Sequence, residues 1–303
     1  MQALYTFDQD RDVSLPALQK PLEKSIADFY PMYMFTLWYA VNICKEVNQE
    51  AQRRGEKHIK TAADENFSVR LFHNPIIQSL ALNPDLEKVV TDGKYHLRFD
   101  NSIFRFYFDE LKKTKRHGAY AASQNNTIAD DKAILNVLFK NILWQSEDFF
   151  NMMEDLFPGW NDDEKIVALT IGQFVDTFDE TKEKNSLKVK RDYPDEKKFG
   201  VDLLQACFNH FTGLENSIEP KLKNWDKERV ALVDRLLLIM ATAELLYFPN
   251  IPVKVTLNEY IEIAKHYSTP QSGHFINGIL DNLVKDFTEN NMMSKTGRGR
   301  IDS

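Results

Sequence analysis

Most segments of the chain place apolar residues at the spacing of an amphipathic helix. Between residues 127 and 143 the apolar positions lie three or four residues apart and so form one stripe of a helix. Thr127 precedes this stripe and is suited to be its N-cap. A second amphipathic helix is predicted over about residues 162–180. The pattern therefore predicts an all-α fold.

The first half of the chain contains a long helical pattern over residues 16–54, which we expect to be broken or kinked near Pro31. Its most apolar run, residues 29–41, is shorter than the roughly 20 residues that a membrane span needs, so it predicts a buried helix. Residues 96–114 alternate between aromatic and charged residues, which favours a helix buried on one side. A strand over residues 103–108 is the competing interpretation.

The pattern is clearest in the last third of the chain. A helix over about residues 194–209 is predicted to lead into another that ends near Leu222. Residues 226–248 are apolar almost all round, which is typical of a central buried helix. Pro249 and Pro252 end this helix.

Two further helices are predicted after these prolines. Thr256, with Glu259 three residues later, has the form of a capping box at the start of the first. Thr269 and Pro270 are typical of the N-cap and first turn of the second. The inward-facing positions predicted for this final helix are Phe275, Ile276, Ile279, Leu280 and Leu283.

The composition is that of a globular protein and its charge restricts how it can bind nucleic acid. Of 303 residues 43% are apolar, and the formal net charge is -7, which argues against a protein that coats nucleic acid by charge alone. Residues 1–180 carry 20 basic and 28 acidic side chains, whereas residues 181–303 carry 18 and 17. A polyanion would therefore prefer the second part of the chain.

Sequence motifs of enzymes, cofactor sites and metal sites are not found. The chain contains no glycine-rich phosphate loop, and its seven histidines are scattered without the spacing of metal ligands. Cys44 and Cys207 are far apart and fit buried thiols in a reducing compartment. No signal peptide is evident. We expect a cytoplasmic protein that is not an enzyme and has no cofactor or metal.

The segment from residue 251 to residue 284 carries the most specific motif of the chain. It reads IPVKVTLNEYIEIAKHYSTPQSGHFINGILDNLV and resembles the signature of the NusB family of transcription antitermination factors. The ten matching positions are Pro252, Lys254, Val255, Asn258, Glu259, Phe275, Asn277, Gly278, Leu280 and Asp281. The run Gln2-Ala3-Leu4-Tyr5 also resembles the first helix of that family.

This resemblance implies a NusB-like helical bundle with an added helical region. We expect residues 1–15 to form its first helix, 16–185 an inserted helical region, 186–290 the NusB-like domain and 291–303 a flexible basic tail. The boundary is placed in the lysine-rich run 181–198. Long members with such an insertion are the pattern of the Bacteroidetes-type relatives. The role of the insertion is left open.

The resemblance also implies partners. Members of the family bind the boxA element of ribosomal RNA transcripts jointly with NusE, the ribosomal small-subunit protein ten, in a complex with RNA polymerase and other Nus factors. Tyr5 and Phe275 match positions near the RNA, with plain packing as the alternative. Asp234 matches a position at the NusE contact and, with Arg235, is the predicted partner site; an internal salt bridge is the alternative.

Other residues of the predicted site are assigned from their place in the chain. Gln271, Ser272 and His274 begin the final helix, where free backbone N–H groups can meet a phosphate or be capped. Asn258 and Asn277 are expected to bond the backbone across a helix junction. Gly278 is expected to allow close helix packing.

Two basic features compete with this site for RNA, and each is alternatively a solvated surface. One is the cluster of Lys112, Lys113, Lys115 and Arg116 in the insertion. The other is the tail, in which Lys295, Arg298 and Arg300 are predicted to contact RNA. In the family, an arginine-rich half-helix precedes Gln-Ala-Leu-Tyr, whereas this chain begins at Met1 inside that helix. We therefore expect an upstream start, a truncated chain or weaker RNA binding by that route.

Two alternative functions follow from the same resemblance. Ribosomal RNA cytosine-5 methyltransferases carry a NusB-like helical domain, so the chain could be an accessory domain of an RNA-modifying system. The second alternative is a protein-binding helical scaffold with weak RNA binding or none.

Overall fold

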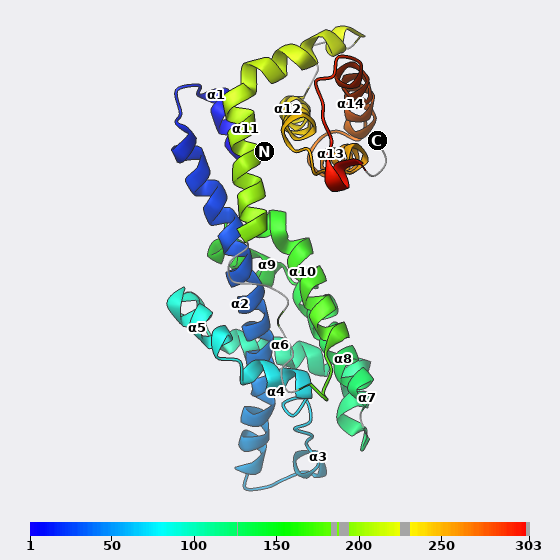
Figure 1. Cartoon of the computed structure of the whole chain (residues 1–303). Coiled ribbons are helices and arrows are strands. Elements are labelled where there is room, and N and C mark those ends of the chain that lie inside the picture. Colours follow the sequence, from blue (N-terminus) through cyan, green and yellow to red (C-terminus); the bar gives the residue numbers. More distant parts are fainter. Residues whose placement is uncertain (126, 183–186, 188–193, 225–230, 301–303) are drawn as a thin grey trace. The chain divides into compact units, whose positions relative to one another are not determined.

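A computed structural model describes residues 1–125, 127–182, 187, 194–224 and 231–300 (Figure 1). Every regular element in these ranges is helical, which confirms the all-α prediction. The chain divides into two compact units. Unit 1 comprises Met1–Ile26 and Tyr193–Ser303, and unit 2 comprises Ala27–Asp192. Much of the predicted boundary run 181–198 lies outside the described residues, namely 183–186 and 188–193.

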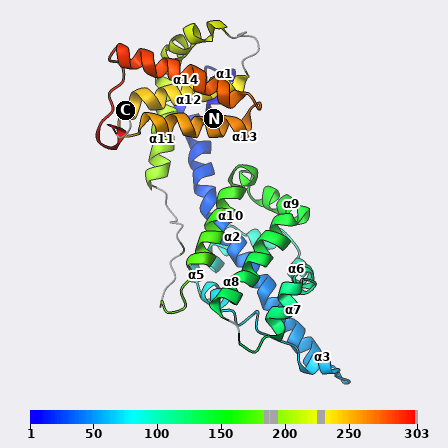
Figure 2. The same ribbon diagram turned by 90° about the vertical axis from the view of Figure 1, so that its right-hand side faces the viewer.

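Unit 1 is built around one helix that the others cover. Figure 2 shows α12, α13 and α14 lying side by side, with α11 running across them. The elements of this unit are α1 (Gln2–Gln9), the start of α2 (Leu15–Gly55), α11 (Pro194–Ile218), η4 (Glu219–Asn224), α12 (Leu232–Tyr247), α13 (Val253–Tyr267), α14 (Ser272–Glu289) and η6 (Gly297–Arg300).

The core of unit 1 follows the apolar pattern of the sequence. Four successive residues of α12 are almost completely buried: Leu236, Leu237, Leu238 and Ile239. The five positions predicted to face inward on the final helix are also buried, which confirms that part of the pattern. Burial of each such side chain stabilises the fold by roughly 1.5–3 kcal/mol. Leu18 of α2 joins this core, so the start of α2 lies in unit 1.

The helix boundaries in unit 1 differ from the predicted ones at three places. α11 is one helix over Pro194–Ile218, where two were predicted. α13 begins at Val253 after Pro252, and Thr256 is buried within it, so the predicted capping box is wrong. α14 begins at Ser272, so Thr269 and Pro270 lie in the turn before the helix. In each case the ends depend on contacts with other helices, which local spacing does not contain.

Unit 2 surrounds the remainder of α2 with shorter helices. In order these are α3 (Ala62–Glu65), α4 (Pro75–Ala81), α5 (Pro84–Asp92), η1 (Tyr95–Leu97), α6 (Ser102–Lys112), α7 (Lys115–Ala122), α8 (Ile128–Val137), the π-helical turn η2 (Leu138–Ile142), η3 (Leu143–Gln145), α9 (Glu147–Leu156) and α10 (Trp160–Thr177). The helix predicted for residues 96–114 is therefore confirmed as α6, and the alternative strand is wrong. Thr127 caps α8, as predicted.

The long helix α2 continues through Pro31 without the predicted break. A proline inside a helix removes one backbone hydrogen bond, which normally destabilises it. Here the next residues Met32, Tyr33, Met34 and Phe35 are completely buried, so packing outweighs that loss. No helix in the described ranges is long and apolar enough to cross a membrane.

Aromatic side chains fill the core of unit 2. Tyr39 of α2 is buried and its ring contacts those of Phe35, Phe104 and Phe149, with centroid distances of 5.8, 4.9 and 5.5 Å. Such edge and tilted contacts add to the gain from burial. The aromatic residues at 29–41 and 96–114 thus form one core.

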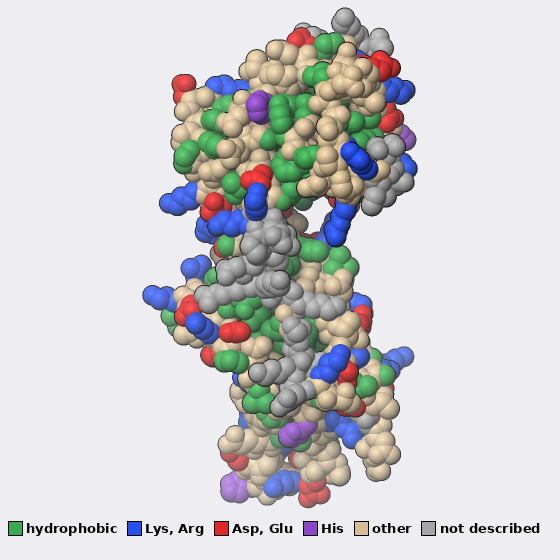
Figure 3. Space-filling model, in the orientation of Figure 1, with side chains coloured by type: hydrophobic (Ala, Val, Ile, Leu, Met, Phe, Trp, Pro, Cys, Tyr) green, Lys and Arg blue, Asp and Glu red, His purple; other side chains and the backbone are tan. Residues whose placement is uncertain are grey.

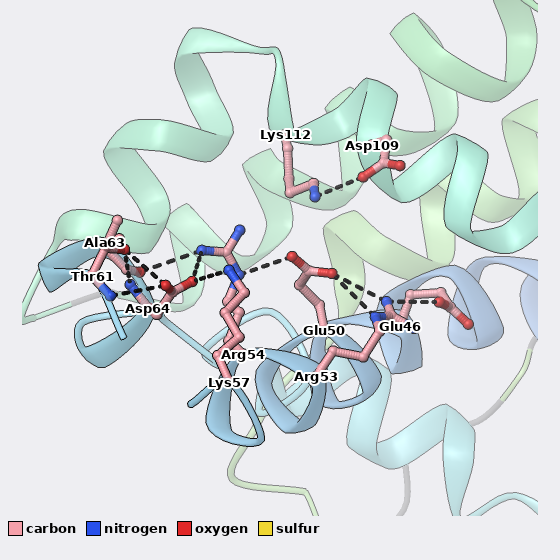
Figure 4. Close-up of polar contacts among 10 residues, drawn as sticks. All are labelled: Glu46, Glu50, Arg53, Arg54, Lys57, Thr61, Ala63, Asp64, Asp109 and Lys112. Carbon is pink, nitrogen blue, oxygen red and sulfur yellow. Dashed lines mark hydrogen bonds and ion pairs between the residues drawn. The ribbon is translucent and has the colours of Figure 1, made fainter. Parts of the chain in front are cut away.

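An ionic network closes the end of α2 against α3 (Figure 4). Glu50 accepts hydrogen bonds from Arg53 and Arg54, at 3.2 and 2.8 Å. Arg54 and Lys57 both bind the Asp64 carboxylate, at 3.2 and 2.8 Å. The hydrogen bond from Lys57 and those within the capping box of α3 lower the pKa of Asp64. This network fixes where the chain turns after α2.

Candidate nucleic-acid interface

The start of α14 is joined to the first turn of α12 by a buried hydrogen bond. The Ser272 hydroxyl donates to Asp234 Oδ2 at 2.7 Å, and both residues are at least 95% buried. The Thr269 N–H donates to the same Ser272 oxygen at 3.2 Å. Asp234 Oδ1 is buried and has no hydrogen-bond partner among the described residues.

This arrangement changes the roles predicted for both residues. A carboxylate near the N-terminus of a helix is stabilised by the backbone N–H groups and the helix dipole, as a bound phosphate would be. Asp234 thus lies where a phosphate was predicted to bind. Because Asp234 and Ser272 are buried, their side chains belong to the helix junction and are not part of an exposed partner or RNA surface.

Arg235, the other predicted partner residue, holds three helices together. Its guanidinium pairs with Asp8 of α1 and with Glu215 of α11, the latter at 2.9 Å. The internal salt bridge considered for Asp234 is therefore made by its neighbour. About a third of the Arg235 side chain (36%) is exposed, which leaves part of it available to a partner.

Three of the predicted RNA-binding residues lie on the surface of unit 1. Tyr5 is 49% exposed because α1 turns Leu4 and Phe7 into the core. Gln271 and His274 are exposed at the start of α14. Phe275 beside them is only 6% exposed and packs in the core, so the packing alternative is correct for it.

The segment predicted to be a flexible tail makes contacts with the end of α12 and the turn that follows it. Lys295 is 8% exposed and its ammonium donates to the carbonyl oxygen of Phe248 at 3.1 Å, at the end of α12. The Thr296 N–H donates to the Pro249 carbonyl at 2.9 Å. Burial lowers the pKa of Lys295. Lys295 therefore caps α12, and its burial counts against the predicted RNA contact, whereas Arg298 and Arg300 are exposed.

Several of the predicted RNA-binding residues lie at the two ends of α12. Ser272 is hydrogen-bonded to Asp234 in the first turn of α12, and Lys295 is hydrogen-bonded to the Phe248 carbonyl at the other end of that helix. These two anchor points are separated by about 20 Å along α12, at about 1.5 Å per residue. The structure groups Gln271 with His274, and Arg298 with Arg300, at opposite ends of this helix.

A second buried polar group lies near Lys295. Glu244 of α12 accepts hydrogen bonds from Thr256 at 2.7 Å and from Tyr260 at 3.2 Å. Burial raises the pKa of Glu244 above its ordinary value. Thr256, which lies within the motif at residues 251–284, thus joins α13 to Glu244 of α12.

Other motif residues have roles different from those expected. The Asn277 amide donates to Asp281 one turn along the same helix, at 3.1 Å, and Asn258 is exposed on α13. The predicted backbone bonds across a helix junction are therefore wrong for Asn277. A Cβ placed on Gly278 would meet nothing within 4 Å outside its own helix in the described structure, so close helix packing is also wrong.

The basic cluster in unit 2 is largely neutralised. Lys112 pairs with Asp109 at 2.6 Å, Lys113 pairs with Glu110, and Arg116 pairs with Asp130 at 3.2 Å. These pairs support the solvated-surface interpretation, because three of the four cations have an acidic neighbour. They weaken the case for an RNA site in this cluster.

Sequence reasoning missed a groove between α11 and the end of α12. It has a volume of about 400 Å³, and its walls include the exposed rings of His210 and Tyr247. The two residues are far apart in sequence, so no local motif contains them. The only sequence signal is a large aromatic residue at the end of an apolar helix, just before Pro249.

Comparisons with known proteins agree with the motif. A model of the NusB family matches residues 161–285, which begin in α10 and end in α14. The Salinibacter ruber transcription antitermination protein NusB is 43% identical over 108 residues, covering 36% of this chain and 68% of that protein. No solved structure matches.

Two further relatives carry the same name. The Chloroherpeton thalassium protein is 37% identical over 106 residues, covering 35% of this chain and 50% of the relative. The Methylacidiphilum infernorum protein is 46% identical over 83 residues, covering 27% and 58%. The chain thus spans about half to two thirds of the length of these relatives. Because the family model matches residues 161–285 and the Salinibacter ruber relative is 43% identical over 68% of its length, the chain belongs to the NusB family.

Proposed function

We propose that this protein acts in transcription antitermination by binding the boxA element of ribosomal RNA transcripts jointly with NusE. The RNA–protein complex would then join RNA polymerase and other Nus factors. The observation that carries this proposal is the 43% identity, over 108 residues, to a transcription antitermination protein. As a member of this family the protein is a transcription factor and not an enzyme.

The exposed residues of unit 1 support an RNA-binding role. Single-stranded RNA is bound by stacking of bases on aromatic rings and by polar contacts, which does not require a strongly basic protein. Tyr5 offers a half-exposed ring, and Gln271 and His274 offer polar groups at the start of α14. Arg298 and Arg300 offer positive charge at the other end of α12.

The NusE contact is proposed near the first turn of α12. Arg235 is the exposed candidate there, and the buried Asp234 acts by holding α14 in place. A partner that binds beside Arg235 would also lie near α1, because Asp8 pairs with this arginine.

Titration of fluorescently labelled boxA RNA, with and without NusE, tests this function. We expect sequence-dependent binding that NusE tightens, whereas RNA of scrambled sequence should bind weakly in both cases. Tyr5→Ala should weaken boxA binding by about 5- to 100-fold because one stacking contact is lost. Tyr5→Phe is the matched control and should bind nearly as the unchanged protein does.

The same titration separates the alternatives. NusE binding with no effect of RNA would indicate a protein-binding scaffold and would contradict the RNA part of the proposal. If the protein binds neither boxA RNA nor NusE, the whole proposed function is contradicted.

A further inference from the structure

The groove between α11 and the end of α12 contains a pair of stacked rings. The centroids of His210 and Tyr247 are 4.4 Å apart and their planes differ by 16°. Tyr247 is 42% exposed, although Leu245 two residues earlier is 1% exposed. A large aromatic side chain that gains little from burial, and that already takes part in a parallel stack, is suited to extend that stack with a further planar group.

The walls of this groove offer neutral hydrogen-bonding groups. Gln205 and Asn209 of α11 and Asn250 after α12 line it with amide side chains, which can both donate and accept. The acid in the groove, Asp202, is paired with Lys198. The groove can therefore accept a polar planar group without facing an unpaired acid.

The packed C-terminal segment passes beside residues that line the groove. A Cβ on Gly299 would lie 2.0 Å from the Pro249 carbonyl oxygen, so only glycine allows the backbone to approach this closely. Gly297 has a φ of +52°, in the left-handed region that glycine tolerates, and lies beside Asn250. The exposed Arg298 lies between these glycines in the chain, Gly297 near Asn250 and Gly299 near both Pro249 and Asn250, and these two residues line the groove.

Figure 3 shows one face of unit 1. Hydrophobic side chains gather over α11 and α12, and lysine and arginine side chains lie around them. A surface that combines exposed aromatic rings with neighbouring cations is typical of proteins that bind single-stranded nucleic acid.

We infer that this groove binds one nucleotide of single-stranded RNA, with the base on the His210–Tyr247 stack and the adjoining phosphate beside Arg298. This inference rests on the proposed RNA-binding function and extends the RNA contact to the C-terminal end of α12. It also gives a role to the two glycines that flank Arg298, because both lie close to residues that line the groove. The amide side chains in its walls can hydrogen-bond to the edge of a base.

Three variants test this groove in the full chain. The probe is labelled boxA RNA flanked on both sides by uridines. Tyr247→Ala should weaken its binding by about 5- to 100-fold, and Tyr247→Phe, which keeps the ring, should bind nearly as before. Arg298→Gln should weaken binding and reduce the slope of log K against log salt by about one. Phe106→Ala, at an aromatic of unit 2 that is 46% exposed, is the matched control and should have no effect.

A photocross-link gives a readout that is independent of affinity. RNA carrying 4-thiouridine in the flanking uridines should cross-link to the peptide that contains Tyr247. Cross-links confined to the peptides that contain Tyr5 or His274 would overturn the proposal that the groove binds RNA.

The outcomes distinguish this inference from the proposed function. If Tyr5→Ala weakens boxA binding while Tyr247→Ala and Arg298→Gln leave it unchanged, the proposal that the groove binds a nucleotide is wrong and the proposed function is retained. If Tyr247→Ala weakens only the binding of NusE, the groove is a protein site and the inference is overturned. If the unchanged protein does not bind the RNA, both are overturned.

Discussion

The hydroxyl of Ser272 on α14 donates a hydrogen bond to the buried carboxylate of Asp234 on α12, at 2.7 Å. Because Ser272 is the first residue of α14 and Asp234 lies in the first turn of α12, this pair fixes the start of the last long helix against the central one. The second carboxylate oxygen has no hydrogen-bond partner among the described residues, which makes the bond from Ser272 the more important.

Ser272→Ala should destabilise the protein. The substitution leaves a buried carboxylate without its hydroxyl donor, which costs about 1–3 kcal/mol. Urea unfolding measures this free energy, and Asn277→Ala, which removes a more exposed hydrogen bond on the same helix, is the control with an expected loss of less than about 0.5 kcal/mol. Equal stability of the two variants would contradict the importance of the Ser272–Asp234 bond.

Two glycine substitutions should have opposite effects on stability. Gly278→Ala should raise the free energy of unfolding by about 0.5–1 kcal/mol, because alanine favours the helix and its Cβ meets nothing within 4 Å outside it. Gly299→Ala should lower it by about 1–3 kcal/mol, because the Cβ collides with the Pro249 carbonyl. Thermal unfolding of both variants checks the sign. A destabilising Gly278→Ala would mean that this glycine is required inside the fold.

Asp163→Asn should stabilise the protein at neutral pH. Burial, followed by the neighbouring Asp162 and Asp28, raises the pKa of Asp163 from 3.8 to about 6. The folded state therefore binds the proton more tightly than the unfolded state does. The stabilising contribution of the protonated group is complete below pH 3.8 and is lost as the pH rises through about 6.

The asparagine variant carries no charge at any pH, so it should be more stable than the unchanged protein by about 1–2 kcal/mol at pH 7. This difference should shrink towards zero near pH 4. Urea unfolding across that range measures it. A difference that does not depend on pH would show that Asp163 is not the titrating group.

Lys295→Met should lower stability and leave RNA binding intact. The methionine retains most of the aliphatic chain but cannot donate to the carbonyl groups at the end of α12, which should cost about 1–3 kcal/mol. Because the ammonium is buried, the slope of log K against log salt for boxA RNA should not change. A reduced slope would instead support the original prediction that Lys295 contacts RNA.

The sequence by itself determined the all-α class and the inward face of α14. It also contained the motif at residues 251–284 that carries the family resemblance. Apolar spacing is a local property of a helix, so Phe275, Ile276 and Ile279 could be assigned to the core from their positions alone. The apolar circumference of α12 likewise required that other helices cover it.

Only the tertiary structure decided which polar residues are buried and what they bind. Thr256 has the spacing of a capping residue, but its hydroxyl donates a hydrogen bond to Glu244 on another helix. Lys295 lies in a segment whose composition is typical of a flexible tail, but its ammonium caps α12. His210 and Tyr247 form a stacked pair although they lie on different helices. Such contacts depend on how distant segments pack, and the spacing of residues along one helix does not specify that packing.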